Sequence, residues 1–208
     1  MDTPSDSHND VELATRLRTG DDEALAQLFS RHRERLRHMV RLRCDPRLTG
    51  RVDPDDILQE AWLAAHTRRG QLAEQPDLPP FLWLRLIVGQ TLIDTHRRHL
   101  GTRARTAARE VPLLLAAPMV SSECLARHLS ASQTSPSQAA MRGEASEELL
   151  AAINGLAPID REVLMLRHFE ELTNDEVAEV LELSRTAASN RYVRAVTRLR
   201  HAMGTEDE

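Results

Sequence analysis

The chain has 208 residues and a formal net charge of −5, with 41% hydrophobic but only 3% aromatic residues. That charge excludes a uniformly basic protein that coats DNA, and no apolar run approaches the ~18 residues that a membrane-spanning helix needs. Two cysteines without a CxxC spacing indicate neither a disulfide framework nor a zinc site. Leu, Ala, Arg and Glu dominate the composition, and the polar N-terminus does not resemble a signal peptide. We therefore expect an all-α, cytoplasmic protein with no membrane insertion.

The first part of the chain predicts a helical domain over residues 10–100, preceded by a disordered tail at residues 1–9. Gly20 would end a short first helix, because glycine readily adopts the left-handed conformation that closes helices. Asp21 would then cap a second helix that reaches about Arg43.

A third helix is predicted to begin after Asp53, a candidate N-cap that has Pro54 at the first helical position. Apolar residues then recur at helical spacing as far as Ala65. A loop is expected from Arg68 to Pro80, because this stretch holds one glycine and three prolines. The helix predicted over residues 81–99 is apolar around much of its circumference, so it should be largely buried.

Residues 101–143 lack a clean period and contain three prolines, which predicts a linker with one short helix near residues 122–129. A second helical domain is expected over residues 144–203, followed by a tail at residues 204–208. Pro158 would open its second helix.

The end of this second domain predicts a helix-turn-helix. Thr173 to Glu176 form a capping box that opens a short helix ending near Leu181, and Ser184 would cap a last helix reaching about Met203. Glu182 occupies the turn position where glycine is usual. A left-handed conformation there costs about 1 kcal/mol for a residue with a side chain, which favours a turn of different shape.

The charge distribution supports DNA binding by the last helix, which in this motif enters the major groove. Residues 185–200 hold five arginines and no acid, whereas residues 144–182 hold eleven acids and two arginines. Arginine suits phosphate and guanine because its planar fork can bond bidentately, although an ordinary solvated face is the simpler alternative. The candidate DNA contacts here are Arg185, Thr186, Ser189, Asn190, Arg191 and Arg194.

Four segments together resemble the sigma-70 family. Residues 20–25, followed by Leu28, are similar to the opening of its members. Residues 159–200 are similar to its promoter-reading domain, residues 53–62 to its polymerase-binding helix, and residues 81–98 to its promoter-melting helix. The matching positions include Leu166-Arg167, Asp175-Glu176-Val177-Ala178, Arg194-Ala195 and the Asp-Ile-x-Gln-Glu core of Asp56-Ile57-Leu58-Gln59-Glu60. With only these two domains, the chain resembles the extracytoplasmic-function group.

The resemblance implies a sigma factor that binds core RNA polymerase through its β′ and β subunits and recognises two elements of promoter DNA. It also implies regulation by an anti-sigma partner. The acidic start of the third helix would dock on a basic coiled coil of β′, although capping alone also explains carboxylates at a helix N-terminus. The candidate polymerase-binding residues are Asp55, Asp56, Gln59 and Glu60.

For the promoter element called "minus ten", the resemblance implies that the loop before the fourth helix holds a flipped-out base, with an ordinary surface loop as the alternative. Between His96 and Arg109 the chain is basic and contains no acid, which suits duplex phosphates. Gln90 stands where the family often has Asn. The candidate residues for this element are Arg68, Arg69, Gln71, Gln90, Arg97 and Arg98.

Two other classes of function fit the sequence less well. A helix-turn-helix repressor or activator would dimerise on a two-fold operator, but this leaves the Asp-Ile-x-Gln-Glu helix unexplained. An enzyme is not expected, because the sequence has no Gly-rich phosphate loop, metal-ligand spacing or nucleophile elbow. We therefore expect no catalytic residues, no metal and no cofactor.

Overall fold

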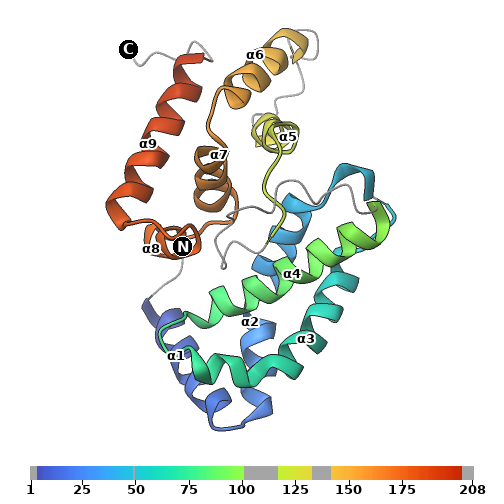
Figure 1. The fold of residues 1–208 in the computed structure, drawn as a ribbon, viewed down its shortest axis with the longest axis vertical. Helices are drawn as coiled ribbons and strands as arrows, with labels where there is room; N and C mark the ends of the chain where they lie inside the picture. The colour runs from blue at the N-terminus through green and yellow to red at the C-terminus, as the bar shows by residue number, and fades with distance from the viewer. Residues whose placement is uncertain (1–3, 49, 101–116, 133–141, 203–208) are drawn as a thin grey trace. The chain divides into compact units, whose positions relative to one another are not determined.

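The computed structural model describes residues 4–48, 50–100, 117–132 and 142–202. These residues form helices and no strand, which confirms the all-α class (Figure 1). They divide into two compact units, Met1–Pro118 and Met119–Glu208. Within the described ranges, no helix combines the length and the apolar character required to cross a lipid bilayer.

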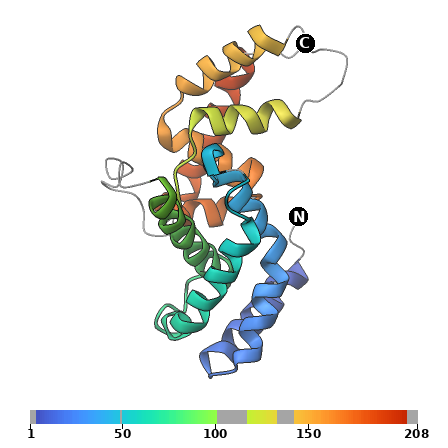
Figure 2. The same ribbon diagram turned by 90° about the vertical axis from the view of Figure 1, so that its right-hand side faces the viewer.

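Unit 1 consists of long helices joined by short connections, with α2, α3 and α4 packed against one another (Figure 2). Its elements are α1 (Pro4–Arg18), α2 (Asp22–Arg43), the 3-10 turn η1 (Pro46–Leu48), α3 (Pro54–Glu74) and α4 (Pro80–Leu100).

Both predicted N-caps of unit 1 are confirmed. The Asp21 carboxylate accepts the backbone N–H of Glu23 at 3.0 Å, and the Asp53 carboxylate accepts that of Asp55 at 2.9 Å. Pro54 follows at the first helical position, where its missing N–H leaves no bond unmade. These caps fix where α2 and α3 begin.

The core of unit 1 forms where the apolar stripes of α2, α3 and α4 meet. Trp83 is 2% exposed, and the Trp62 ring stands edge-on to Phe29 with ring centroids 5.3 Å apart. Each fully buried leucine or isoleucine contributes about 1.5–3 kcal/mol relative to exposure. The largest buried aliphatic side chains include Leu25, Leu28, Leu36, Met39, Ile57, Leu82, Leu84 and Leu92.

Two boundaries differ from the sequence-based expectation. Helix α1 begins at Pro4, so most of the expected tail is helical. The loop expected from Arg68 is wrong in its first half, because α3 continues to Glu74. Leu72 is 0% exposed, and burying it stabilises by about 2 kcal/mol. This gain outweighs the roughly 1 kcal/mol that Gly70 costs inside a helix.

Unit 2 begins with α5 (Ser122–Ser132), which confirms the short helix expected near residues 122–129. It packs on α6 (Arg142–Asn154), and the backbone N–H of Val120 donates to the buried Glu162 carboxylate at 3.1 Å. Residues 101–116 and 133–141 lie outside the described residues. The linker expected over residues 101–143, whose first part includes Arg103, Arg105 and Arg109, stays a prediction.

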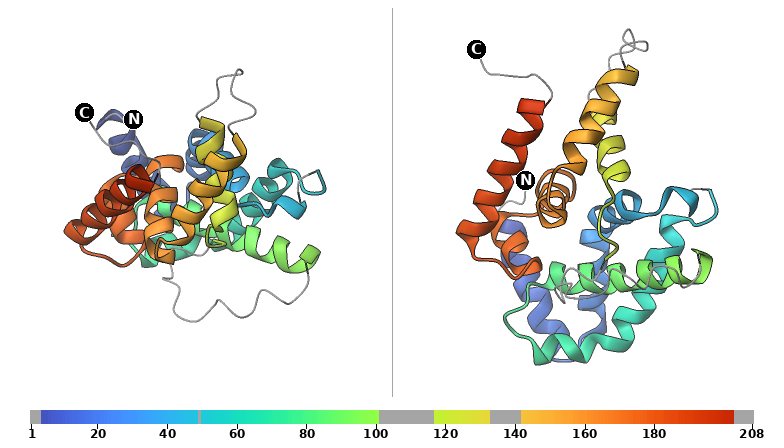
Figure 3. Two further views of the ribbon diagram at one scale, coloured as in Figure 1. Left: turned by 90° about the horizontal axis from the view of Figure 1, so that it is seen from above. Right: turned by 45° about the horizontal axis from the view of Figure 1, so that its top comes forward.

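The remaining elements of unit 2 are α7 (Pro158–Leu164), a π-helical turn labelled η3 (Met165–Phe169), α8 (Asn174–Val180) and α9 (Arg185–Ala202). In the π-helical turn the Glu170 N–H bonds the Met165 carbonyl at 2.9 Å. Helix α9 packs along α6, α7 and α8 (Figure 3). Ala188 and Ala195 are fully buried in that contact, so small residues let α9 approach its neighbours closely.

Candidate nucleic-acid interface

The predicted helix-turn-helix is present as α8, a short turn and α9. Its first helix opens with a complete capping box. The Glu176 N–H donates to Thr173 Oγ1 at 3.2 Å, and the Thr173 N–H donates to Glu176 Oε2 at 2.7 Å. The Asn174 side-chain amide also donates to the Arg185 carbonyl at 3.0 Å, which ties the starts of the two helices together.

The turn is left-handed at Glu182, with φ of 53°. The expectation of a different turn shape is therefore wrong. The Leu183 N–H bonds the Ala178 carbonyl at 2.8 Å and the Glu182 N–H bonds the Glu179 carbonyl at 3.3 Å. These two bonds are the paired closure typical of a helix C-terminus with glycine in the left-handed position. They offset the roughly 1 kcal/mol cost of a side chain there.

Helix α9 has one buried and one exposed face. The buried stripe holds Ala188, Ala195 and Leu199. Four of the six candidate DNA contacts in this helix have exposed side chains away from that stripe, and a fifth, Arg185, is exposed at the helix start. The four are Thr186, Ser189, Asn190 and Arg194.

Arg191, the sixth candidate, faces inward. Its guanidinium donates to the Asp160 carboxylate at 2.8 Å, and the side chain of Asp160 is only 9% exposed. Arg191 lies three residues after the buried Ala188 and four before the buried Ala195, so it belongs to the packed side of α9. The structure thus places this arginine where it holds α9 on α7.

The outward arginines differ in their partners. Arg185 forms an exposed ion pair with Asp175 at 3.0 Å. Arg194 and Arg198 are exposed, and neither makes a hydrogen bond or ion pair with any part of the chain that the structure describes. Two unpaired guanidinium groups four residues apart on one helix side can both follow a phosphate backbone.

In unit 1, the four candidate polymerase contacts all lie at the start of α3 but are not equally available. Asp55 accepts from Arg33 at 2.8 Å and from Arg37 at 2.9 Å. Sequence reasoning missed these two arginines of α2, because nothing local to α3 points to them. Asp56 and Gln59 are exposed, with no side-chain bond to a described residue.

Glu60 and Arg98 form a bidentate ion pair that joins α3 to the end of α4. The distances are 3.2 Å from Nη1 to Oε1 and 2.6 Å from Nη2 to Oε2. The hydrogen bonding of Arg98 to the Glu60 carboxylate, in which the guanidinium donates, raises the pKa of Arg98 above its ordinary value. In the isolated chain, a candidate polymerase contact is therefore paired with a candidate DNA contact.

The candidates expected in a loop before α4 lie instead on the last turns of α3. Arg68 donates to Gln90 of α4, which is another candidate for the same promoter element. Arg69 pairs with Asp22 at 2.9 Å, and Gln71 is exposed. Any contact these side chains make with an unpaired base would start from a helix rather than from a loop.

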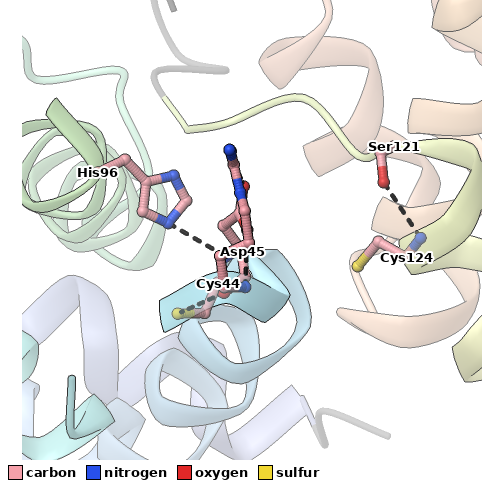
Figure 4. Close-up of polar contacts among 6 residues, drawn as sticks. Cys44, Asp45, His96, Ser121 and Cys124 are labelled. Atoms are coloured by element: carbon pink, nitrogen blue, oxygen red, sulfur yellow. Dashed lines mark hydrogen bonds and ion pairs between the residues drawn. The ribbon is translucent and has the colours of Figure 1, made fainter. Parts of the chain in front are cut away.

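At the end of α4, Arg97 is exposed and pairs with Asp94 at 3.3 Å, whereas His96 turns inward. The Asp45 backbone N–H donates to His96 Nε2 at 3.3 Å (Figure 4). This bond requires an unprotonated Nε2, and burial lowers the pKa of His96 below its ordinary 6.5. His96 is therefore a structural link to the segment after α2 rather than part of the basic surface.

Among the described residues, no three His, Cys, Asp or Glu side chains are grouped as a metal site would need. Burial and the neighbouring Asp45 carboxylate raise the pKa of the Cys44 thiol, which disfavours the reactive thiolate. In unit 2, the Cys124 backbone N–H donates to Ser121 Oγ at 3.1 Å, a capping contact at the start of α5 (Figure 4).

Comparison with known proteins shows what the chain is similar to. Residues 146–199 match the family described as "Sigma-70, region 4". The chain is 38% identical over 92 residues to the ECF RNA polymerase sigma factor SigM of Mycobacterium tuberculosis, covering 43% of each chain. It is 28% identical over 149 residues to the probable RNA polymerase sigma factor RfaY of Xanthomonas campestris pv. campestris, covering 72% of this chain and 34% of that one.

These matches span less than half the length of the curated relatives. Among solved structures, the fold is similar to that of CnrH in complex with the cytosolic domain of CnrY. The TM-score is 0.54 with 22% sequence identity, and the match covers 96% of this chain and 99% of that one. At that identity the likeness shows the fold.

Proposed function

We propose that this chain, a member of the extracytoplasmic-function group of the sigma-70 family, binds core RNA polymerase and directs it to specific promoters. It would act by binding and positioning, without catalysing a reaction itself. Its partners would be the β′ and β subunits of the polymerase and promoter DNA.

The observation that carries this proposal is the outward face of α9. It lies within the segment that matches sigma-70 region 4, it has no acidic residue from Arg185 to Arg200, and it leaves Arg194 and Arg198 unpaired among the described residues. Phosphate contacts position such a helix, and side chains near its start reach the base edges. We assign this face to the upstream promoter element, called "minus thirty-five".

Unit 1 would supply the polymerase contact and the downstream element. Asp56 and Gln59 project from the first turns of α3 and make no side-chain bond to a described residue, so they can meet a basic helix of β′ directly. Arg97 and Arg98 at the end of α4 would contact duplex phosphates beside the opened "minus ten" element. Arg68, Arg69, Gln71 and Gln90 would line the approach to an unpaired base.

We extend the proposal to a regulatory protein partner. The similar solved structure contains CnrH together with the cytosolic domain of CnrY. An anti-sigma protein that bound this chain would cover surfaces that otherwise contact polymerase. This part of the proposal rests on fold likeness and is tested separately, by asking whether a copurified partner blocks holoenzyme formation.

The proposal is tested by mixing the purified chain with core RNA polymerase and separating the products by size-exclusion chromatography. The expected result is a one-to-one complex with core polymerase, formed by a monomeric chain that binds free duplex DNA poorly. A folded chain that stays apart from the core, dimerises and binds a two-fold DNA site alone would instead establish a helix-turn-helix regulator.

A further inference from the structure

Large hydrophobic side chains are strongly exposed at few described positions, and one of these lies in the middle of α9. The exposed set is Val11, Leu63, Met119 and Val193. Val193 is 58% exposed, although the helix around it buries Ala188 and Ala195 completely. Scattered exposed apolar residues are common on protein surfaces, so the meaning of this one depends on its neighbours.

Helical spacing puts Val193 on the face that carries the candidate base contacts. It lies three residues after Asn190, four after Ser189 and seven after Thr186, and all three have exposed side chains. Arg194 lies next to it in the sequence and is unpaired within the described residues. Among the described residues of α9, Val193 is therefore the exposed large hydrophobic side chain in a face whose polar members can bond to bases or phosphates.

The chemistry of the major groove supplies a ligand for such a side chain. The C5 methyl group of thymine is the apolar feature by which a base pair is read there, and short apolar side chains contact it. Valine has no hydrogen-bonding group, and its β-branched side chain has one strongly preferred rotamer in a helix. It can therefore present a fixed apolar surface to that methyl group at little entropic cost.

We propose that Val193 is a specificity-determining residue that contacts the methyl group of a thymine in the upstream promoter element. Asn190, one turn earlier, has the paired donor and acceptor that suit adenine. The two side chains together would select an A·T-containing step beneath the second and third turns of α9. This inference rests on the proposed function and adds a base preference to it.

Charge favours DNA over a protein as the occupant of this face. A protein partner that covered Val193 would also have to neutralise Arg194 and Arg198, which have no acid near them between residues 185 and 200. Nucleic acid supplies the negative charge and the apolar methyl group in one ligand.

The test uses the holoenzyme and an upstream element selected from a random library. Each thymine of that element is replaced in turn by uracil, which removes only the C5 methyl group. The protein variants are Val193→Ala and, as a matched control, Val11→Ala, because Val11 is a valine with the same 58% exposure on α1. Alanine favours helix more than valine does, so neither change should unfold its helix.

One uracil substitution should weaken promoter binding by the wild type by about three- to tenfold. Val193→Ala should weaken binding to the thymine promoter by a similar factor and should be insensitive to that uracil. Val11→Ala should behave as the wild type throughout. Equal sensitivity of Val193→Ala and the wild type to every uracil overturns the inference, as does a selected element without thymine.

These outcomes are distinct from failure of the proposed function. A wild-type chain that forms no holoenzyme overturns the function and the inference together. If the wild-type holoenzyme initiates at promoters and the Val193→Ala holoenzyme binds them with the same affinity and the same response to uracil, the inference alone is overturned. The valine then belongs to another surface.

Discussion

Arg98 at the end of α4 and Arg194 in α9 are both proposed to contact promoter DNA, but they begin from different states. Arg98 is held by both carboxylate oxygens of Glu60, whereas Arg194 has no partner among the described residues. An exposed ion pair contributes only about 0–1 kcal/mol, so a phosphate can displace Glu60. Arg98 must therefore exchange one contact for another in order to bind DNA, whereas Arg194 can bind without breaking a contact to a described residue.

The Glu60–Arg98 ion pair would connect the proposed polymerase binding to the proposed DNA binding. Glu60 is itself a candidate polymerase contact, so its engagement by a basic helix of β′ would release Arg98 for DNA. The Arg191–Asp160 ion pair of unit 2 has a different role from the Glu60–Arg98 pair. It holds α9 on α7, and we do not expect a ligand to displace it.

The largest effect is expected from Asp160→Ala, which leaves Arg191 partly buried without its carboxylate. We expect a loss of about 2–3 kcal/mol in the free energy of unfolding of unit 2. Urea unfolding followed by circular dichroism measures this loss. Both tryptophans, Trp62 and Trp83, lie in unit 1, so the urea midpoint of tryptophan fluorescence should not change.

Asp175→Ala is the matched control, because Asp175 pairs with the exposed Arg185. It should cost no more than about 1 kcal/mol, since exposed ion pairs and helix-end charges contribute little. Equal losses in the two variants would show that the Arg191 pair is no more structural than a surface pair.

Gln59→Ala combined with Glu60→Ala should weaken binding to core polymerase by about tenfold or more, because central polar contacts of an interface carry much of its affinity. The free energy of unfolding of unit 1 should change little, since both side chains are exposed. Titration of labelled chain with core polymerase measures the affinity. Wild-type affinity in the double variant would remove the polymerase assignment from α3.

Arg194→Ala should weaken binding of the holoenzyme to promoters by about three- to tenfold, and nearly uniformly across upstream sequences. The slope of log affinity against log salt should fall in magnitude by about one, as expected for the loss of one phosphate contact. Binding measured over a salt series tests both. A changed sequence preference with an unchanged slope would make Arg194 a base contact instead.

The smallest effect is expected from pH, through His96. Burial lowers the pKa of His96, so the folded state favours the neutral ring that accepts the Asp45 N–H. Its contribution to stability is complete above about pH 6.5 and is lost as pH falls below that value, where the unfolded chain takes up the proton first.

His96→Gln should therefore make the stability of unit 1 less dependent on pH between 7.5 and 5.5. The urea midpoint of tryptophan fluorescence, measured at both pH values, gives this dependence for the variant and the wild type. The same fall in both proteins would assign the pH dependence to other groups.

Much of this fold follows from local sequence signals. The caps at Asp21, Asp53 and Thr173 could be identified because each acts on backbone groups within three residues. The end of α3 could not, because burial of Leu72 in tertiary packing overrides the local preference of Gly70. The shape of the turn at Glu182 was likewise set by backbone closure rather than by residue type.

The candidate site likewise has members that the sequence predicts and partners that only the fold brings to them. Its exposed members on α9 follow from helical spacing and charge. The partners of Arg191 and Arg98 lie 31 and 38 residues away in the sequence, so only the folded chain brings Asp160 and Glu60 to them. Sequence alone therefore counts Arg191 among the candidate DNA contacts, although it belongs to the packed side of the helix.

Run-off transcription on a genomic fragment library, by core polymerase with and without this chain, shows whether the chain directs polymerase to specific promoters. We expect new discrete transcripts whose promoters share two upstream sequence elements about two helical turns apart, and we expect Arg194→Ala to weaken these transcripts. The same transcripts with and without a folded chain, free of any inhibitor, would contradict the proposed function.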